Sequence, residues 1–292
     1  MTRVESPVSA SATTAQGTFT SAAAAAPALE VRDIVKRYVS DHGTLTALDR
    51  VSFSVAPGEV LSVIGPSGCG KSTLFNVIGG LCERDEGSVT VDGRSVTGPH
   101  ASIGMVFQEE STFPWRSVEQ NVAFPLELAG LERRERLRRA HDYLALVGLQ
   151  GFERHHPLQL SGGMRQRVAI ARTLAFRPKI LLMDEPFAAL DEQTRRLLGD
   201  KVLHIQQELA QTTLLITHHI AEAVQLSDRV LVMTYRPGRV KRIIDIALPR
   251  PRTSEVLGSE AFGHYVAQIW HDLRDEASRG MREAEDQTRE IR

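Results

Sequence analysis

The sequence predicts an α/β protein whose sheet is largely parallel and whose chain is interrupted by a helical insertion. Three observations lead to this prediction. Short apolar runs typical of buried strands recur along the chain, segments with helical spacing alternate with them, and one long stretch in the middle is almost entirely helical. Strands that alternate with helices favour parallel pairing, because each crossover helix covers a face of the sheet.

The expected elements follow from the spacing of apolar residues. Residues 60–64 form a continuous apolar run that ends in Gly65, which suits a buried strand, and residues 71–78 have helical spacing. The other expected strands are residues 29–38, 47–55, 87–91, 102–107, 179–183, 213–217, 230–234 and 240–246. The other expected helices occupy most of residues 117–174 and residues 192–209.

The two ends of the chain differ in composition from the rest. Residues 1–27 are rich in Ala, Ser and Thr, and we expect a disordered leader there. Residues 248–252, Leu-Pro-Arg-Pro-Arg, form a stiff linker, after which Phe262, Ile269 and Leu273 lie at helical spacing. That helix is expected to dock on the body, with a partner surface as the alternative. The organisation predicted is therefore a leader (1–27), an α/β core (28–107 and 175–247), a helical subdomain (108–174), and a linker with its helix (248–292).

Composition excludes several classes of protein. The chain has 292 residues, 42% of them hydrophobic and 24% charged, which is the profile of a globular protein and not of a disordered chain or a collagen. The formal net charge of -1 argues against a nucleic-acid binder that works through bulk positive charge. Two cysteines cannot form a disulfide framework, and no apolar run is long enough for a transmembrane helix.

The strand at residues 60–64 is followed by a phosphate-binding loop. The sequence reads Gly-Pro-Ser-Gly-Cys-Gly-Lys-Ser from position 65, which fits the pattern G-x-x-x-x-G-K-[ST] in its required place between a strand and a helix. Glycines let backbone N–H groups wrap a polyphosphate, and the helix N-terminus favours the anion. We expect ATP to be bound by Gly65, Pro66, Ser67, Gly68, Cys69, Gly70, Lys71, Ser72 and Thr73. Lys71 would reach the β- and γ-phosphates.

Two carboxylates end the buried strand expected near residues 179–183. The chain reads Ile-Leu-Leu-Met-Asp-Glu from position 180, so Asp184 and Glu185 lie at a carboxyl end, where α/β folds bind ligands. Asp184 can hold Mg²⁺ together with the hydroxyl of Ser72. Glu185 can position or deprotonate a water molecule that attacks the γ-phosphate.

A second anion-binding helix start decides the class. Residues 160–168 read Leu-Ser-Gly-Gly-Met-Arg-Gln-Arg-Val, and Ser161 is a good N-cap beside two glycines. This string resembles the signature of the nucleotide-binding subunits of ABC transporters. The resemblance covers roughly residues 29–251 and implies a P-loop NTPase (RecA-like) core with an antiparallel β portion and an inserted helical subdomain. It also implies that Ser161, Gly162 and Gly163 bind the γ-phosphate held by a second copy of the chain, so that two chains enclose two ATP molecules head to tail.

The same resemblance gives roles to four further residues. Tyr38 matches the aromatic residue that stacks on adenine, and Gln108 matches the glutamine that senses Mg²⁺ and the γ-phosphate. Asp191 matches the acid of a loop that crosses to the partner's site. His218 matches the switch histidine that contacts the γ-phosphate. His219 departs from the family, which usually has aspartate there, and we choose His218 of the two because it directly follows Thr217 at the end of the expected strand.

The segment after Gln108 points to a subgroup. Phe113-Pro-Trp115, followed by Val-Glu-Gln-Asn-Val from position 118, resembles importer ATPases for nitrate, aliphatic sulfonates and taurine. The resemblance implies a motor peripheral to the cytoplasmic face of the membrane, with an integral-membrane permease as direct partner, a solute-binding protein as indirect partner and no nucleic acid. Phe113 and Trp115 are candidates for the groove that receives the permease. The alternatives are an ABC ATPase for another cargo, such as a thiamine-precursor-like solute, and an ABC ATPase outside transport.

Two further expectations concern Cys69 and the paired histidines. Cys69 lies at a helix N-terminus near Lys71, which predicts a depressed thiol pKa, with the alternative that it only fills a tolerant position. Alkylation of a reactive thiol here would block ATP binding, and MgATP would protect it. His155, His156, His218 and His219 have no ligand spacing relative to a cysteine or acid cluster, so no zinc site is expected.

Overall fold

The larger of two sheets forms the centre of the molecule. The computed structural model describes residues 26–41, 43–109 and 111–290. In spatial order the strands of this sheet are β10 (Val240–Asp245), β9 (Arg229–Met233), β3 (Val60–Ile64), β8 (Thr212–Ile216), β7 (Ile180–Asp184) and β6 (Ile103–Val106). Only β10 is antiparallel to its neighbour, and the others pair in parallel. The predicted parallel core is therefore confirmed.

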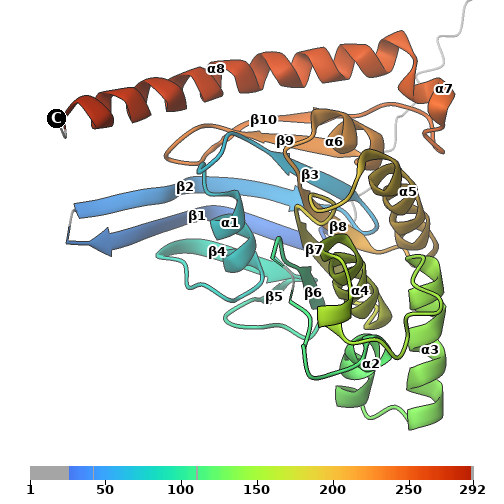
Figure 1. Ribbon diagram of the computed structural model, residues 1–292. Helices are drawn as coiled ribbons and strands as arrows, with labels where there is room; N and C mark the ends of the chain where they lie inside the picture. The colour runs from blue at the N-terminus through green and yellow to red at the C-terminus, as the bar shows by residue number, and fades with distance from the viewer. Residues whose placement is uncertain (1–25, 42, 110, 291–292) are drawn as a thin grey trace, which may run out of the picture.

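The smaller sheet is antiparallel throughout. Its order is β2 (Gly43–Val55), β1 (Leu29–Ser40), β4 (Glu86–Val91) and β5 (Arg94–Ser95). One face of it packs over α1 (Lys71–Ile78), so that α1 lies between the two sheets (Figure 1). Leu74, Phe75 and Ile78 of α1 are buried in this shared core. Both β2 and β1 extend further toward their shared turn than the sequence predicts.

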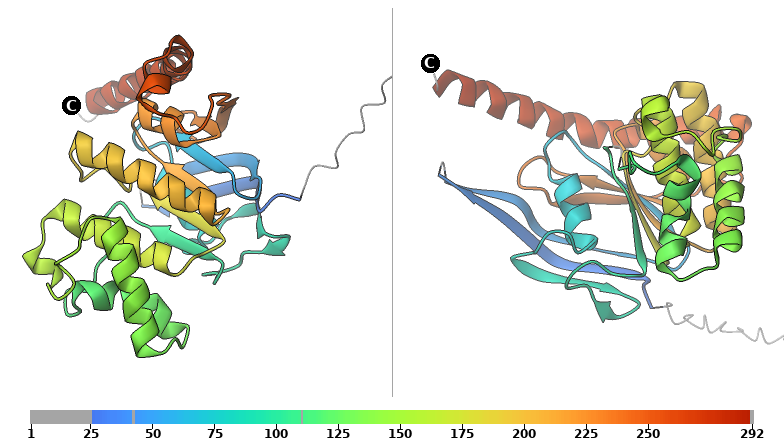
Figure 2. Two further views of the ribbon diagram at one scale, coloured as in Figure 1. Left: turned by 90° about the vertical axis from the view of Figure 1, so that its right-hand side faces the viewer. Right: turned by 60° about the horizontal axis from the view of Figure 1, so that its bottom comes forward.

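The helical group between β6 and β7 consists of α2 (Val118–Leu128), α3 (Arg133–Leu146) and α4 (Gly162–Ala175). These helices pack on one another at one side of the core (Figure 2). The prediction that residues 117–174 are mostly helical is confirmed, but the interruption at residues 147–161 is longer than the sequence pattern indicated. Gly148 and Gly151 adopt positive φ there, and only the short 3-10 turn Pro157–Gln159 is helical, because left-handed glycines and a proline interrupt the α-helix.

The C-terminal segment covers the outer face of the larger sheet. After α5 (Glu192–Glu208) and α6 (Ile220–Leu226) come a short helix α7 (Ser254–Leu257) and the long helix α8 (Glu260–Glu290). Phe262 and Ile269 of α8 are buried in a cluster with α6, β9 and β10, which confirms the predicted docking. The helix runs far beyond Leu273 and lies along one side of the whole molecule (Figure 1).

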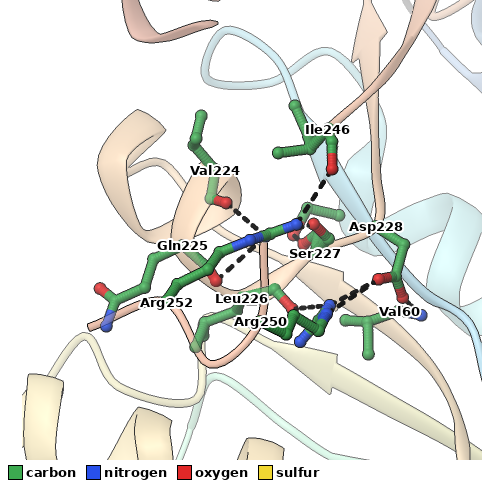
Figure 3. A network of polar contacts seen from close by, with 10 residues as sticks. Val60, Val224, Gln225, Leu226, Ser227, Asp228, Ile246, Arg250 and Arg252 are labelled. Atoms are coloured by element: carbon green, nitrogen blue, oxygen red, sulfur yellow. Dashed lines mark hydrogen bonds and ion pairs between the residues drawn. The ribbon is translucent and has the colours of Figure 1, made fainter. Parts of the chain in front are cut away.

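A buried arginine anchors the linker that precedes α7. Arg252 donates hydrogen bonds to the carbonyls of Val224, Gln225 and Ser227 at the end of α6, and to that of Ile246 (Figure 3). Cations are favoured at a helix C-terminus, where carbonyls lack partners. Burial, and then the neighbouring Arg250, lower the pKa of Arg252 to about 10. The linker is thus tied to the helix that follows the paired histidines.

The described residues bear on the predictions of a membrane span and of an N-terminal leader in different ways. In that range, no helix combines the length and apolar character that crossing a membrane requires. The expected leader falls mostly on residues 1–25, which lie outside the described residues. The proposed domain boundaries remain predictions.

Candidate functional site

A cleft of about 410 Å³ lies beside the phosphate loop. It is formed by β1 and β2, the start of α1, the ends of β6 and β7, and the loop between β9 and β10. The lining residues are Tyr38, Leu45, Ala47, Ser67, Gly68, Gly70, Lys71, Ser72, Thr73, Gln108, Glu185 and Arg236. Most of them were predicted from sequence as nucleotide-binding residues, whereas Arg236 was not.

The phosphate loop is shaped to present backbone N–H groups. Gly70 caps α1 at φ 99°, a left-handed conformation that favours glycine, and no side chain caps the helix. A Cβ at this position would lie 2.8 Å from the carbonyl oxygen of Ala47. Lys71 Nζ donates to the carbonyls of Gly65 at 2.8 Å and Pro66 at 2.9 Å, so the ammonium lies across the mouth of the loop. The uncapped helix start and this ammonium form an anion site.

Asp184 lies at the end of β7 and receives a hydrogen bond from Ser72. Burial raises the pKa of Asp184, an effect that Ser72 and Lys71 partly offset and that Glu185 adds to. A divalent cation beside this carboxylate would favour its charged form. The oxygen donors of Ser72 and Asp184, with Gln108 at the same cleft, therefore fit the hard ligand set that Mg²⁺ prefers.

Three predicted catalytic side chains meet at Glu185. His218 Nδ1 lies 3.1 Å from Glu185 Oε2, and Gln108 Nε2 lies 3.4 Å from the same oxygen. Glu185 itself has φ 45°, which is uncommon for a residue with a side chain. Strained backbone of this kind clusters at functional sites, because the surrounding fold holds the residue in place. A carboxylate, an imidazole and an amide thus converge beside the phosphate loop, which is the arrangement needed to orient a water molecule.

The paired histidines face different partners. His218 contacts Glu185, whereas His219 Nε2 lies 3.0 Å from the NH1 atom of Arg195. Because Arg195 is always a donor, His219 accepts this hydrogen bond as a neutral ring. Burial lowers the pKa of His219, and the nearby His218 and Arg195 lower it further. The structure therefore places His218, and not its neighbour, in the position expected of the switch histidine.

Arg195 connects His219 to the loop that carries Asp191. Its guanidinium donates to the carbonyls of Phe187 and Leu190, which flank that loop. Asp191 accepts a hydrogen bond from the backbone N–H of Thr194 at 2.9 Å, and this bond is the main cause of its lowered pKa. Sequence reasoning missed Arg195, because only the fold brings it to His219.

The signature segment lies outside the cleft. Ser161 caps α4 by accepting a hydrogen bond from Met164 N at 3.3 Å. Gly163 packs so closely on the loop before Asp191 that a Cβ there would lie 2.9 Å from Leu190 Cδ2 and 3.1 Å from the carbonyl oxygen of Ala189. None of the described residues that line the cleft belongs to the signature. Within one chain, Ser161, Gly162 and Gly163 therefore lie outside the cleft that Lys71 lines.

Gln166 is a residue of the signature helix that the site analysis from sequence did not single out. It is buried, and its Nε2 donates to the carbonyl of Phe107, the residue before Gln108. Arg172 of the same helix donates to the carbonyl and hydroxyl of Ser111. α4 is thus bonded to both ends of the segment around Gln108.

Phe113 and Trp115 differ in burial. Phe113 packs edge-on against Phe124, with ring centroids 4.8 Å apart, and lies under the Arg172 guanidinium. Trp115 leaves 73% of its surface exposed. Of the two candidates for a partner groove, Phe113 is partly buried by its ring contacts, whereas Trp115 exposes most of its surface to a partner.

The prediction for Cys69 is wrong. Its side chain is fully buried, and burial raises its pKa despite the favourable charge of Lys71. The thiol belongs to the hydrophobic core shared by the two sheets and α1, and Cys69 is not among the residues that line the cleft. The described residues also contain no cluster of three or more His, Cys, Asp or Glu side chains suited to a metal ion.

Comparison with known proteins agrees with this geometry. Residues 48–188 match the family model described as ABC transporter. The chain is 48% identical over 254 residues to an uncharacterized ABC transporter ATP-binding protein of Methanocaldococcus jannaschii, covering 87% of this chain and 94% of that protein. It is 44% identical over 252 residues to the nitrate import ATP-binding protein NrtD of Synechocystis sp. The alignment covers 84% of this chain and 95% of that protein. It is 47% identical over 206 residues to the taurine import ATP-binding protein TauB of Shigella boydii. The alignment covers 70% of this chain and 81% of that protein.

A solved structure gives the same result for the fold. An ATP-binding cassette determined as a dimer in a post-hydrolysis state, bound to ADP and Pi, superimposes with a TM-score of 0.70 at 33% identity. The match covers 75% of this chain and 98% of that one. A chain that aligns with such relatives over most of their length, and folds as their cassettes do, belongs to the ATP-binding subunits of ABC transporters and hydrolyses ATP.

Proposed function

We propose that this chain is the motor of an importer for a small solute such as nitrate, an aliphatic sulfonate or taurine. It works as a head-to-tail dimer on the cytoplasmic face of the membrane and drives a separate permease that a solute-binding protein supplies. The importer rests on the relatives that are named for nitrate, sulfonate and taurine import. The observation that carries the dimer is the separation of the two anion-binding helix starts. Lys71 and Glu185 line one cleft and Ser161 lies outside it, so a complete site needs a second copy.

The cycle begins with ATP binding to each monomer. Tyr38 stacks on the adenine, and the uncapped start of α1 with Lys71 holds the phosphates. When two monomers close, Ser161 and Gly163 of one engage the γ-phosphate held by the other. The closed dimer binds ATP better than ADP, and this difference in affinity drives the movement.

Hydrolysis uses the group around Glu185. The carboxylate takes a proton from the attacking water, while Gln108 and His218, which both contact it, orient the water and stabilise charge on the γ-phosphate. Ser72 and Asp184 would hold Mg²⁺, which when bound would supply positive charge that offsets the charge of the phosphates. Asp191, placed beside the partner's site by its loop, helps to join the two sites.

Coupling to the permease is proposed for the surface around Trp115. The indole is exposed and lies just before α2, in the helical group that moves with the signature. The subgroup is supported by the similarity to relatives named for nitrate and taurine import. A cargo from this group also agrees with the Phe-Pro-Trp segment at residues 113–115.

The test is growth of a deletion strain on defined sole sources of sulfur and nitrogen. We expect loss of growth on taurine or alkanesulfonates with growth kept on sulfate, or loss on nitrate alone. Wild-type protein should restore growth, and the matched Glu185→Gln protein, expressed at the same level, should not. If the strain grows normally on all of these sources, the subgroup is wrong and another organic solute, such as a vitamin precursor, becomes the leading cargo.

A further inference from the structure

The loop between β9 and β10 brings an arginine to the nucleotide cleft. Arg236 Nε donates to the carbonyl of Gly68 at 2.8 Å, in the middle of the phosphate loop. A Cβ at Gly68 would lie 2.8 Å from the NH2 atom of Arg236, so the guanidinium lies flat against the loop. Arg236 also lines the same cleft as Lys71. A second cation is therefore placed where a polyphosphate would bind.

Several N–H groups of the Arg236 guanidinium have no hydrogen-bond acceptor among the described residues. Among the described residues, Arg236 has no carboxylate within ion-pair distance, and its two terminal nitrogens make no hydrogen bond. Arg239, three residues later, provides the contrast, because both its Nε and its NH2 donate to Asp49. Arginine forms paired, charge-assisted hydrogen bonds with phosphate oxygens, so free donors beside a phosphate loop have an obvious acceptor.

The backbone that carries Arg236 is held from the side of the phosphate loop. Gly238 donates to the carbonyl of Ala47 and accepts from Asp49 N, which joins the turn to β2. A Cβ at Gly238 would lie 2.2 Å from the carbonyl oxygen of Cys69. This close approach, which only glycine allows, presses the turn against the loop.

The long helix α8 holds the same turn from the other side. Tyr235 N donates to Oε2 of the buried Glu276 at 3.0 Å, and Glu276 is paired with Lys241 at 2.9 Å. Gly280 leaves room for the Tyr235 ring, since a Cβ there would lie 2.7 Å from it. The turn lies beneath α8 in Figure 1. Arg236 is thus positioned by two flanking structures, as a binding residue on an otherwise mobile hairpin would need to be.

We propose that Arg236 is a further phosphate-binding residue of the nucleotide site, one that engages the β- and γ-phosphates together with Lys71. Gly68 and Lys71 line the same cleft, and Lys71 is the residue expected to reach these phosphates, whereas Tyr38 is the residue expected to stack on adenine. The inference rests on nucleotide binding and not on the proposed cargo, so each can fail without the other.

The test is nucleotide affinity of the full-length chain, measured by calorimetry with ADP, a non-hydrolysable ATP analogue and AMP. Arg236→Ala should weaken binding of ADP and the ATP analogue by about 10-fold or more, the range for a hydrogen bond to a charged group. AMP affinity should change by less than about 2-fold, because AMP lacks both of those phosphates. Arg236→Lys, which keeps the charge, should recover most of the lost affinity.

Arg239→Ala is the matched control, since it removes a guanidinium from the same hairpin but outside the cleft. It should leave all three affinities within about 2-fold of wild type, because exposed ion pairs contribute little. ADP and ATP affinities that survive in Arg236→Ala overturn the proposal. Equal losses for AMP and ATP, with a lower melting temperature of the nucleotide-free protein, also overturn it, because they indicate that Arg236 only supports the fold.

Discussion

The phosphate loop and the signature are both glycine-containing turns that open a helix, and they are completed in different ways. At the start of α1 no side chain caps the helix, and the free N–H groups face a cleft that also contains Lys71 and Glu185. At the start of α4, Ser161 already caps the helix, and none of the cleft residues lies beside it. The same local physics thus gives one binding site within the chain and one surface that needs a second chain.

The largest expected effect is the loss of ATP affinity when the phosphate loop, which is complete within one chain, is altered. Lys71→Ala removes the ammonium that spans the loop mouth and should weaken ATP binding by about 100-fold or more, because two charge-assisted hydrogen bonds to phosphate are lost. Titration with a fluorescent ATP analogue measures this effect. Retained affinity would refute the role of the loop.

The next effect separates binding from chemistry in the same cleft. Glu185→Gln keeps the shape of the side chain but cannot accept a proton, so hydrolysis should fall by about 100- to 1,000-fold while ATP binding persists. A phosphate-release assay measures hydrolysis, and size-exclusion chromatography in the presence of ATP measures whether the variant binds ATP and dimerises. We expect an ATP-dependent dimer, and turnover at the wild-type rate would show that another group is the base.

The third effect tests the signature residues, which are proposed to complete the site of a second chain. The substitution leaves each monomer's own cleft intact. Ser161→Arg places a bulky cation where the partner's nucleotide would approach, so ATP-analogue affinity of the monomer should stay within about 2-fold while hydrolysis falls by about 100-fold. Ser161→Ala is the control for the helix cap, whose loss costs about 1 kcal/mol of stability. Normal hydrolysis by Ser161→Arg would contradict a site shared between chains.

A smaller effect concerns chemical access to the loop. Cys69 is buried and its pKa is raised, whereas Cys82 is only partly buried, so iodoacetamide at pH 8 should label Cys82 about 10-fold faster or more. Peptide mass spectrometry of the native protein, with a denatured control, gives the two rates. Faster labelling of Cys69 would mean that the loop opens in solution.

The smallest effect concerns His219, whose pKa is lowered by burial. A depressed histidine pKa favours the neutral folded form, so its contribution to stability is present above pH 6.5 and is lost as pH falls through the folded pKa. Glu185, Glu192, Arg195, His218 and Glu222 are the charged or titratable groups around it. In His219→Asp, which restores a carboxylate opposite Arg195, the melting temperature should fall less between pH 7 and pH 5 than in wild type. An identical fall in both proteins would exclude His219 as the cause.

Much of the site could be predicted because phosphate chemistry constrains local sequence. The loop at residues 65–72 and the acids Asp184 and Glu185 each follow an apolar strand, so their position at the edge of the sheet follows from the pattern alone. The interruption of the helical stretch at residues 147–161 is longer than predicted, because apolar spacing was given more weight than the glycines and the proline. The thiol of Cys69 was misjudged because sequence does not say toward which side a loop turns its side chains.

By itself the sequence determined most strands and the longer helices, the phosphate loop, the acids and the signature, since each depends on residues that are neighbours in the chain. It did not predict the short elements β5, α6 and α7. Tertiary structure alone decided that His218 contacts Glu185, that Arg195 joins His219 to the loop before Asp191, and that Arg236 reaches Gly68. Arg236 and Gly68 are 168 residues apart in the chain. Contacts over such separations depend on how strands are ordered in the sheet and on what α8 covers, and no local pattern of residues encodes them.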